Sequence, residues 1–164
     1  MRLLVTRPRT QAEPFAEELR ALGHDAIVQP LLDYRRLPFD ASALGEADAL
    51  IVTSTNALRA LREAEAHSHI LDLPLYCAGP ETAREARRLG AKKIASVGET
   101  AADLAGAILS SAPRGTRFVH LAGEHRAFEM EKALALGELS CRSLTLYTMA
   151  DCERFRPDVE RSLA

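Results

Sequence analysis

The sequence predicts an α/β protein with a doubly wound parallel sheet. Between about residues 47 and 148, short apolar segments alternate with helical patterns of about 10–12 residues, which is typical of such a sheet. The apolar run 50–52 is typical of a strand buried on both faces. Polar residues 53–56 follow it, and Leu58 and Leu61 then recur at helical spacing. This is one half of an α/β unit, and the carboxyl ends of its strands line a ligand crevice.

Composition excludes several classes of protein. The chain has 164 residues, of which 47% are apolar, and a net charge of −2, so a core is expected and nucleic-acid binding is not. No apolar run is long enough to span a membrane or to serve as a signal peptide. Cys77, Cys141 and Cys152 lie far apart without metal-ligand spacing. We therefore expect no metal and a reducing, cytoplasmic compartment.

The first 32 residues predict one βαβ unit. A strand begins at Leu3, a helix covers residues 10–22, and a second strand covers residues 26–32. Pro14 is expected in the first turn of the helix, where a missing N–H costs little. Pro30 favours an edge strand or a bulge. Such a unit is too small to bury a core alone.

The rest of the chain predicts a second region between two linkers. Residues 33–38 predict a linker or an extended crossing, residues 151–156 a second linker, and Pro157 the start of a last helix. Between the linkers we expect strands near 50–54, 74–78, 92–97, 117–122 and 139–148, in one flavodoxin-like five-stranded sheet. Helices are expected near 56–66, 81–89, 101–111 and 127–136, and Thr100 with Asp103 resembles a capping box. Both ends of the chain are interpreted as parts of one domain whose remainder is absent.

Standard catalytic signatures are missing from the sequence. There is no dinucleotide-binding glycine motif, no Walker A loop and no nucleophile elbow. His120 and His125 flank a strand end, but no carboxylate or nucleophile stands at an evident spacing, so a catalytic histidine is only an alternative. What remains is a set of polar turns at strand carboxyl ends, namely Thr6-Arg7-Pro8, Ser54-Thr55-Asn56, Gly79-Pro80-Glu81-Thr82, Gly98-Glu99-Thr100 and Gly123-Glu124-His125-Arg126. Four of these turns should crowd one edge of the second sheet, where N–H groups, hydroxyls and a cation can bind carboxylates.

Each candidate also has a purely structural explanation. Residues 54–56 can simply cap a helix. Arg126 can be a solvated first-turn residue. Tyr147 closes the last strand and can be a half-buried strand aromatic with its hydroxyl at the surface. The residues alone leave these alternatives open.

Four stretches of the sequence resemble the uroporphyrinogen-III synthase family. They are LLVTRP at the start, IVTSTNALRA, CAGPETAREARRLGA and LTLYT. They occur in the order and with the spacing of that family, and together they span the chain. The last stretch places Tyr147 at the position of the family's most nearly invariant tyrosine.

The resemblance implies two lobes, with a five-stranded α/β domain inserted into a second α/β domain. The inserted domain would cover residues 35–150. Residues 1–34 would form the βαβ part of the discontinuous domain, and residues 151–164 the return linker and the start of its C-terminal part. Family members typically have about 250 residues, as two-domain chains of this kind do. We therefore expect the rest of this domain to be absent here, and the 164-residue chain to be inactive alone.

The resemblance also implies a lyase that acts in the biosynthesis of haem and related tetrapyrroles. Hydroxymethylbilane, a linear tetrapyrrole, would lose water and close to uroporphyrinogen III with ring D inverted, without a cofactor. The azafulvene left by loss of hydroxide reacts unaided to the wrong isomer, so the enzyme must mainly control conformation. Tyr147 is the candidate acid or hydrogen-bond donor for the departing hydroxyl. The candidate substrate-binding residues are Thr6, Arg7, Pro8, Ser54, Thr55, Asn56, Gly79, Pro80, Thr82, Gly123 and Arg126.

The expected partner is therefore the small-molecule substrate, with no nucleic acid and no membrane. A monomer in transient contact with hydroxymethylbilane synthase is a further expectation. The alternative is a non-catalytic anion-binding α/β domain, or an inactive fragment of a synthase.

Overall fold

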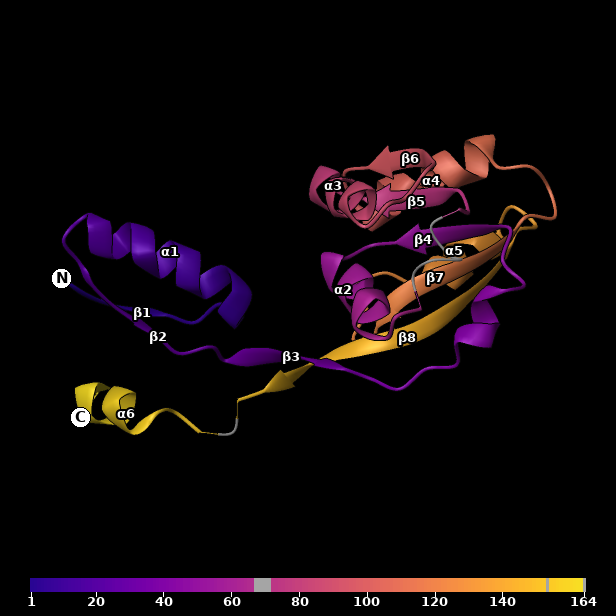
Figure 1. The fold of residues 1–164 in the computed structure, drawn as a ribbon. Coiled ribbons are helices and arrows are strands. Elements are labelled where there is room, and N and C mark those ends of the chain that lie inside the picture. Colours follow the sequence, from indigo (N-terminus) through magenta and orange to yellow (C-terminus); the bar gives the residue numbers. More distant parts are fainter. Residues whose placement is uncertain (67–71, 153, 164) are drawn as a thin grey trace. The chain divides into compact units, whose positions relative to one another are not determined.

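The chain forms two compact units in the computed structural model, which describes residues 1–66, 72–152 and 154–163 (Figure 1). Unit 1 comprises residues 1–35 and 149–164. Unit 2 comprises residues 36–148.

Unit 1 contains a small parallel sheet and a covering helix. Strands β1 (Arg2–Val5) and β2 (Asp25–Val28) pair in parallel, and α1 (Arg9–Ala21) packs against them. The buried core of this unit consists of Val5, Ala12, Ala16, Ala26 and Val28. The arrangement matches the predicted βαβ unit. Helix α6 (Pro157–Leu163) begins at Pro157, also as predicted.

The sequence predicts Pro14 in the first turn of the helix, but in the structure it lies beyond the first turn of α1. The helix begins at Arg9, because the carbonyl of Pro8 accepts from the N–H groups of Gln11 and Ala12 at 2.9 and 3.0 Å. Pro14 therefore lies inside the helix, where it has no N–H to donate to the preceding turn.

The predicted strand at residues 26–32 is two strands. β2 ends at Val28, and β3 (Leu32–Arg36) begins after Pro30, which cannot donate to a ladder. Of the two alternatives predicted for residues 33–38, a linker or an extended crossing, the extended one is confirmed, because most of these residues belong to β3.

Strand β3 lies beside β8 (Ser140–Asp151), which extends beyond its predicted end at residue 148. The Leu37 N–H donates to the Leu146 carbonyl, and the Cys152 N–H donates to the Leu31 carbonyl, both at 2.9 Å. These two bonds show that the strands run in opposite directions.

The described residues of unit 2 contain five parallel strands that alternate with helices. The strands are β4 (Ala49–Val52), β5 (Leu75–Ala78), β6 (Ile94–Gly98), β7 (Arg117–Gly123) and β8. The helices are α2 (Thr55–Glu63), α3 (Pro80–Arg88), α4 (Ala101–Ser111) and α5 (Met130–Ala135), and a short 3-10 helix, η1 (Ala41–Leu44), precedes β4. Every pairing among these five strands is parallel, as predicted. The prediction of a five-stranded sheet was incomplete, because β3 adds a sixth strand beside β8.

The strand order differs from the flavodoxin-like order expected from the sequence. The sheet runs β3-β8-β7-β4-β5-β6, so the parallel strands counted from β4 are arranged 3-2-1-4-5, whereas flavodoxin has 2-1-3-4-5. The alternation of strands and helices in a sequence does not reveal where each crossover places the next strand. Because the chain returns from β6 to place β7 beside β4, the direction of winding reverses between β4 and β7.

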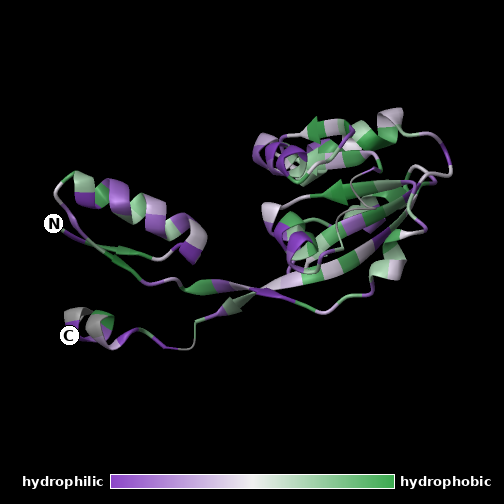
Figure 2. Cartoon of the chain, viewed as in Figure 1, coloured by the Kyte–Doolittle hydropathy of each residue, from purple (hydrophilic) through white to green (hydrophobic). Residues whose placement is uncertain are grey.

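Helices cover both faces of this sheet. Ala49 and Ile51 of β4 share a buried cluster with Leu104 of α4 and Leu134 of α5. Successive strand residues point to opposite faces, so Leu50 faces away from that cluster. Helices α2 and α3 contact each other and share no residue with it. Figure 2 shows β4 in green, as burial on both faces requires, and purple residues on α2 and α3.

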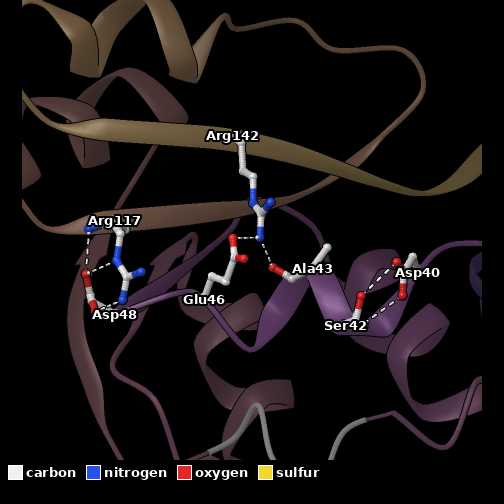
Figure 3. A network of polar contacts seen from close by, with 7 residues as sticks. All are labelled: Asp40, Ser42, Ala43, Glu46, Asp48, Arg117 and Arg142. Carbon is white, nitrogen blue, oxygen red and sulfur yellow. Dashed lines mark hydrogen bonds and ion pairs between the residues drawn. The ribbon is translucent and has the colours of Figure 1, made fainter.

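Ion pairs hold the amino-terminal edge of the sheet together (Figure 3). Arg117 of β7 binds Asp48 through two guanidinium contacts of 2.9 and 3.0 Å and through its backbone N–H at 2.9 Å. These hydrogen bonds lower the pKa of Asp48 to about 2. Arg142 of β8 donates to the carbonyl of Ala43 and pairs with Glu46 at 3.4 Å. Both arginines are therefore engaged by carboxylates.

Candidate functional site

Four polar turns lie along the carboxyl edge of the unit 2 sheet. The strands before residues 53–56, 79–82, 98–100 and 123–126 are parallel, so these turns share one edge, as predicted. Two of them begin helices with side-chain caps. The Ser54 hydroxyl accepts from the Asn56 N–H at 3.2 Å, and Thr100 with Asp103 forms the predicted capping box.

A cavity of about 230 Å³ opens at the carboxyl ends of β4, β7 and β8. β4 and β7 are neighbours and flank the point where the winding reverses, which is where open α/β sheets bind ligands. The cavity is lined by Thr53, Ser54, Ala101, His120, Ala122, Gly123, His125, Arg126, Ala127, Phe128 and Tyr147.

Tyr147 lies directly over Gly123 in this cavity. A Cβ atom on Gly123 would stand 2.8 Å from Cζ of Tyr147 and 3.0 Å from its hydroxyl oxygen, so only glycine leaves room for the ring. The β7–β8 register shifts after Ala122 and brings Gly123 opposite Tyr147. Tyr147 is 9% exposed, so its aromatic ring packs into the fold while the residue still lines the cavity.

His120 is the buried polar residue of the cavity, with 3% of its surface exposed. Its Nε2 lies 3.0 Å from Thr53 Oγ1, and its Nδ1 lies 3.4 Å from Ser143 Oγ. Burial and the positive charge of Arg126 lower the pKa of His120 to about 4, against a smaller opposing effect of Glu131. The imidazole is therefore neutral at pH 7.

The charge of the cavity suits an anion. Arg126 is its one permanent cation, and none of the eleven described residues that line it carries a carboxylate. A guanidinium N–H of Arg126 reaches Thr145 Oγ1 at 3.5 Å, which directs the side chain along β8. Three residues with hydroxyl groups, Thr53, Ser54 and Tyr147, line the same space.

The structure gathers four of the predicted site residues into this cavity and places the others elsewhere. Ser54, Gly123, Arg126 and Tyr147 line it. Thr55 and Asn56 lie in the first turn of α2, and Gly79, Pro80 and the buried Thr82 begin α3 at the same sheet edge. Thr6, Arg7 and Pro8 follow β1 in unit 1, where the Arg7 guanidinium lies 5.2 Å from the centre of the Phe15 ring.

Sequence reasoning did not single out the pairing of His120 with Thr53. The partners of His120 stand 67 and 23 residues away, and only the strand register brings them together. In that register Ile51, His120 and Ser143 lie in one row across three strands. The available signal was a lone histidine inside the apolar run 118–122.

Two features are absent from the residues that the structure describes. No group of three or more potential metal ligands occurs among them. None of the helices among them has the length and apolar character needed to cross a bilayer.

Unit 2 is thus an α/β domain with an anion-compatible cavity where its winding reverses. The family model for uroporphyrinogen-III synthase HemD matches residues 13–164. The chain belongs to the uroporphyrinogen-III synthase family, as the four sequence stretches predicted. No curated protein sequence is significantly similar to it.

Solved structures of this family have the same fold at low sequence identity. A mutant uroporphyrinogen III synthase from the extremely thermophilic bacterium Thermus thermophilus is 19% identical, with a TM-score of 0.70 over 93% of this chain and 64% of that one. The wild-type Thermus enzyme in another crystal form is 20% identical, with a TM-score of 0.56 over 99% of this chain and 66% of that one. Uroporphyrinogen-III synthetase from Helicobacter pylori is 15% identical, with a TM-score of 0.65 over 85% of this chain and 62% of that one. The chain thus spans somewhat less than two thirds of the length of the first of these proteins.

Proposed function

We propose that this protein is a uroporphyrinogen-III synthase, a lyase of tetrapyrrole biosynthesis that cyclises hydroxymethylbilane with loss of water and inversion of ring D. The family match over residues 13–164 carries the proposal. The position of Tyr147 in a cavity whose described lining has a cation and no carboxylate supports it.

In this proposal the site binds and folds the substrate, and does little covalent chemistry. The azafulvene cyclises unaided, so the useful work is to hold the substrate in the conformation that leads to isomer III. Substrate carboxylates would bind to Arg126, to the hydroxyls of Thr53 and Ser54, and to N–H groups along the carboxyl edge. The Tyr147 hydroxyl would donate to the departing hydroxyl group.

The same proposal extends to the lobes and partners. Residues 36–148 form one compact unit and residues 1–35 with 149–164 another, which supports an inserted domain (35–150) within a discontinuous one (1–34 and 151–164). Thr6, Arg7 and Pro8, which follow β1 in unit 1, are proposed as further substrate-binding residues. We also propose a cytoplasmic monomer that receives its unstable substrate by transient contact with hydroxymethylbilane synthase.

The test is a coupled assay in which hydroxymethylbilane synthase supplies the substrate to the full protein. The oxidised products are then separated into isomers I and III. We expect isomer III to dominate. Isomer I alone, formed at the rate seen in buffer, would contradict the proposal, and saturable binding of substrate without isomer III would favour the non-catalytic anion-binding alternative.

A further inference from the structure

Three strands of unit 2 are joined beside the cavity by one chain of polar side chains, of which Thr53 and His120 line the cavity. It runs from Thr53 at the end of β4, through His120 of β7, to Ser143 of β8, with contacts of 3.0 and 3.4 Å. The backbone N–H of Ser143 in turn donates to the carboxylate of Glu131 on α5. A buried imidazole costs free energy unless both ring nitrogens have partners, and here both do.

The number of protons in this chain restricts how it can be arranged. A neutral imidazole has one N–H, so one ring nitrogen donates and the other accepts. If Nε2 carries the proton, it donates to Thr53, and the Thr53 hydroxyl keeps its own hydrogen to donate into the cavity. If Nδ1 carries the proton, it donates to Ser143, and Thr53 must donate to Nε2. In that second arrangement Thr53 offers only lone pairs to a ligand.

An anion in the cavity selects between these two arrangements. Arg126 attracts an anion there, and a carboxylate accepts hydrogen bonds but cannot donate them. A carboxylate beside Thr53 is therefore bound well only when Nε2 of His120 carries the proton and the Thr53 hydroxyl donates to the carboxylate. Burial and Arg126 keep the pKa of His120 near 4, which leaves the ring neutral and able to choose either tautomer.

The size of the cavity restricts what can enter it. A cavity of about 230 Å³ accepts a short carboxylate-bearing chain, whereas pockets that bind whole drug-sized ligands have roughly 300–1,000 Å³. A tetrapyrrole with acetate and propionate side chains could place one such arm here.

We propose that His120 is a positioning residue whose Nε2–H tautomer holds the Thr53 hydroxyl as a donor toward one carboxylate arm of the ligand beside Arg126. The proposal rests on the proposed function only in assigning that carboxylate arm to a tetrapyrrole substrate. The geometry of the cavity by itself calls only for a small carboxylate as the ligand.

The test uses propionate as the probe and reads the tautomer directly. The full protein is labelled with ¹⁵N-histidine, and two-bond ¹H–¹⁵N spectra identify which ring nitrogen of His120 is protonated during a propionate titration. We expect saturable binding and a bound state with the proton on Nε2. A bound state with the proton on Nδ1, or the absence of saturable propionate binding, overturns the proposal.

Two variants of His120 supply the matched comparison. The amide of His120→Gln can reach the position of Nε2 and donate to Thr53, whereas the shorter His120→Asn reaches only toward Ser143. We expect His120→Gln to bind propionate within about threefold of the wild-type affinity, and both His120→Asn and Thr53→Val to lose about tenfold, as for one hydrogen bond to a charged group. Equal propionate affinity of the Gln and Asn variants would contradict the proposal. If a variant does not fold, the tautomer of His120 in the propionate-bound wild-type protein still tests the proposal.

The failure of this inference can be separated from the failure of the proposed function. Propionate binding and the tautomer do not require turnover, and the isomer assay does not require this cavity to bind propionate. Isomer III without Nε2 protonation refutes only the role of His120. The expected tautomer without isomer III refutes only the synthase.

Discussion

At the scale of single residues, Tyr147 is the side chain on which the chemistry should depend most. Tyr147→Phe keeps the packed ring and removes only the hydroxyl. We expect kcat/KM for isomer III to fall by about one to two orders of magnitude, or about 1.4–3 kcal/mol. Tyr76→Phe is the control, since Tyr76 packs edge-on against Phe118 and does not line the cavity. Equal effects of the two substitutions would show that the Tyr147 hydroxyl has no particular role.

Gly123 should matter because of the space it leaves. In Gly123→Ala the new methyl group would stand 2.8 Å from Cζ of Tyr147, so the ring must move. We expect at least the loss of activity caused by Tyr147→Phe, together with lower thermal stability. Gly106→Ala is the matched control, because its new Cβ would meet no atom within 4 Å apart from its chain neighbours and the backbone of its own helix. Alanine also stabilises a helix interior by about 0.5–1 kcal/mol relative to glycine. A fully active Gly123→Ala variant would mean that the placement of the ring is unimportant.

His120 should make the stability of the protein depend on pH. Its folded pKa of about 4 lies below the ordinary 6.5, because of burial and Arg126, with Glu131 opposing. Above pH 6.5 both states are neutral, but between pH 6.5 and 4 the unfolded chain binds the proton and the folded protein does not. The free energy of unfolding should therefore fall by up to about 3 kcal/mol as the pH is lowered from 6.5 to 4.

Urea unfolding at a series of pH values measures this dependence, with His120→Gln as the comparison. The variant cannot titrate at this position, so its stability should fall less steeply over the same window. Parallel curves for the two proteins would contradict the assigned pKa.

At the scale of elements, the start of α4 shows how one turn at the carboxyl edge is built. The Asp103 N–H donates to Thr100 Oγ1 at 3.1 Å, and the Thr100 N–H donates to Asp103 Oδ2 at 3.0 Å. We expect Thr100→Ala to lower the free energy of unfolding by about 1 kcal/mol. Ser110→Ala in the same helix removes only a bond to the Gly106 carbonyl and should change stability by less than about 0.5 kcal/mol. If both variants unfold at the wild-type urea concentration, the cap contributes nothing.

The elements that the sequence predicted well are those determined by local chemistry. The capping box of α4 and the alternation of β4 to α5 follow from residues within about one element of each other. The break of residues 26–32 into two strands was not predicted, since the pairing of β3 with β8 joins residues more than a hundred positions apart. The strand order was missed for the same reason.

At the scale of the whole molecule, the site is a product of strand order. Ser54, Gly123, Arg126 and Tyr147 could be proposed from the sequence, because polar turns after parallel strands share one edge. The contact between Thr53 and His120 could not, because it depends on β7 lying beside β4 and on the register between them. The two edges of the sheet also differ: at the amino edge Arg117 and Arg142 are paired with carboxylates, whereas the described lining of the cavity has none.

The central claim is that the substrate binds at the carboxyl edge of the unit 2 sheet. Uroporphyrin III, the stable oxidised form of the product, can be titrated into the ¹⁵N-labelled full protein while backbone amide shifts are followed. We predict that the largest shifts occur at Thr53, Gly123 and Tyr147. Shifts concentrated instead at Asp48, Arg117 and Arg142, on the opposite edge, would contradict the account.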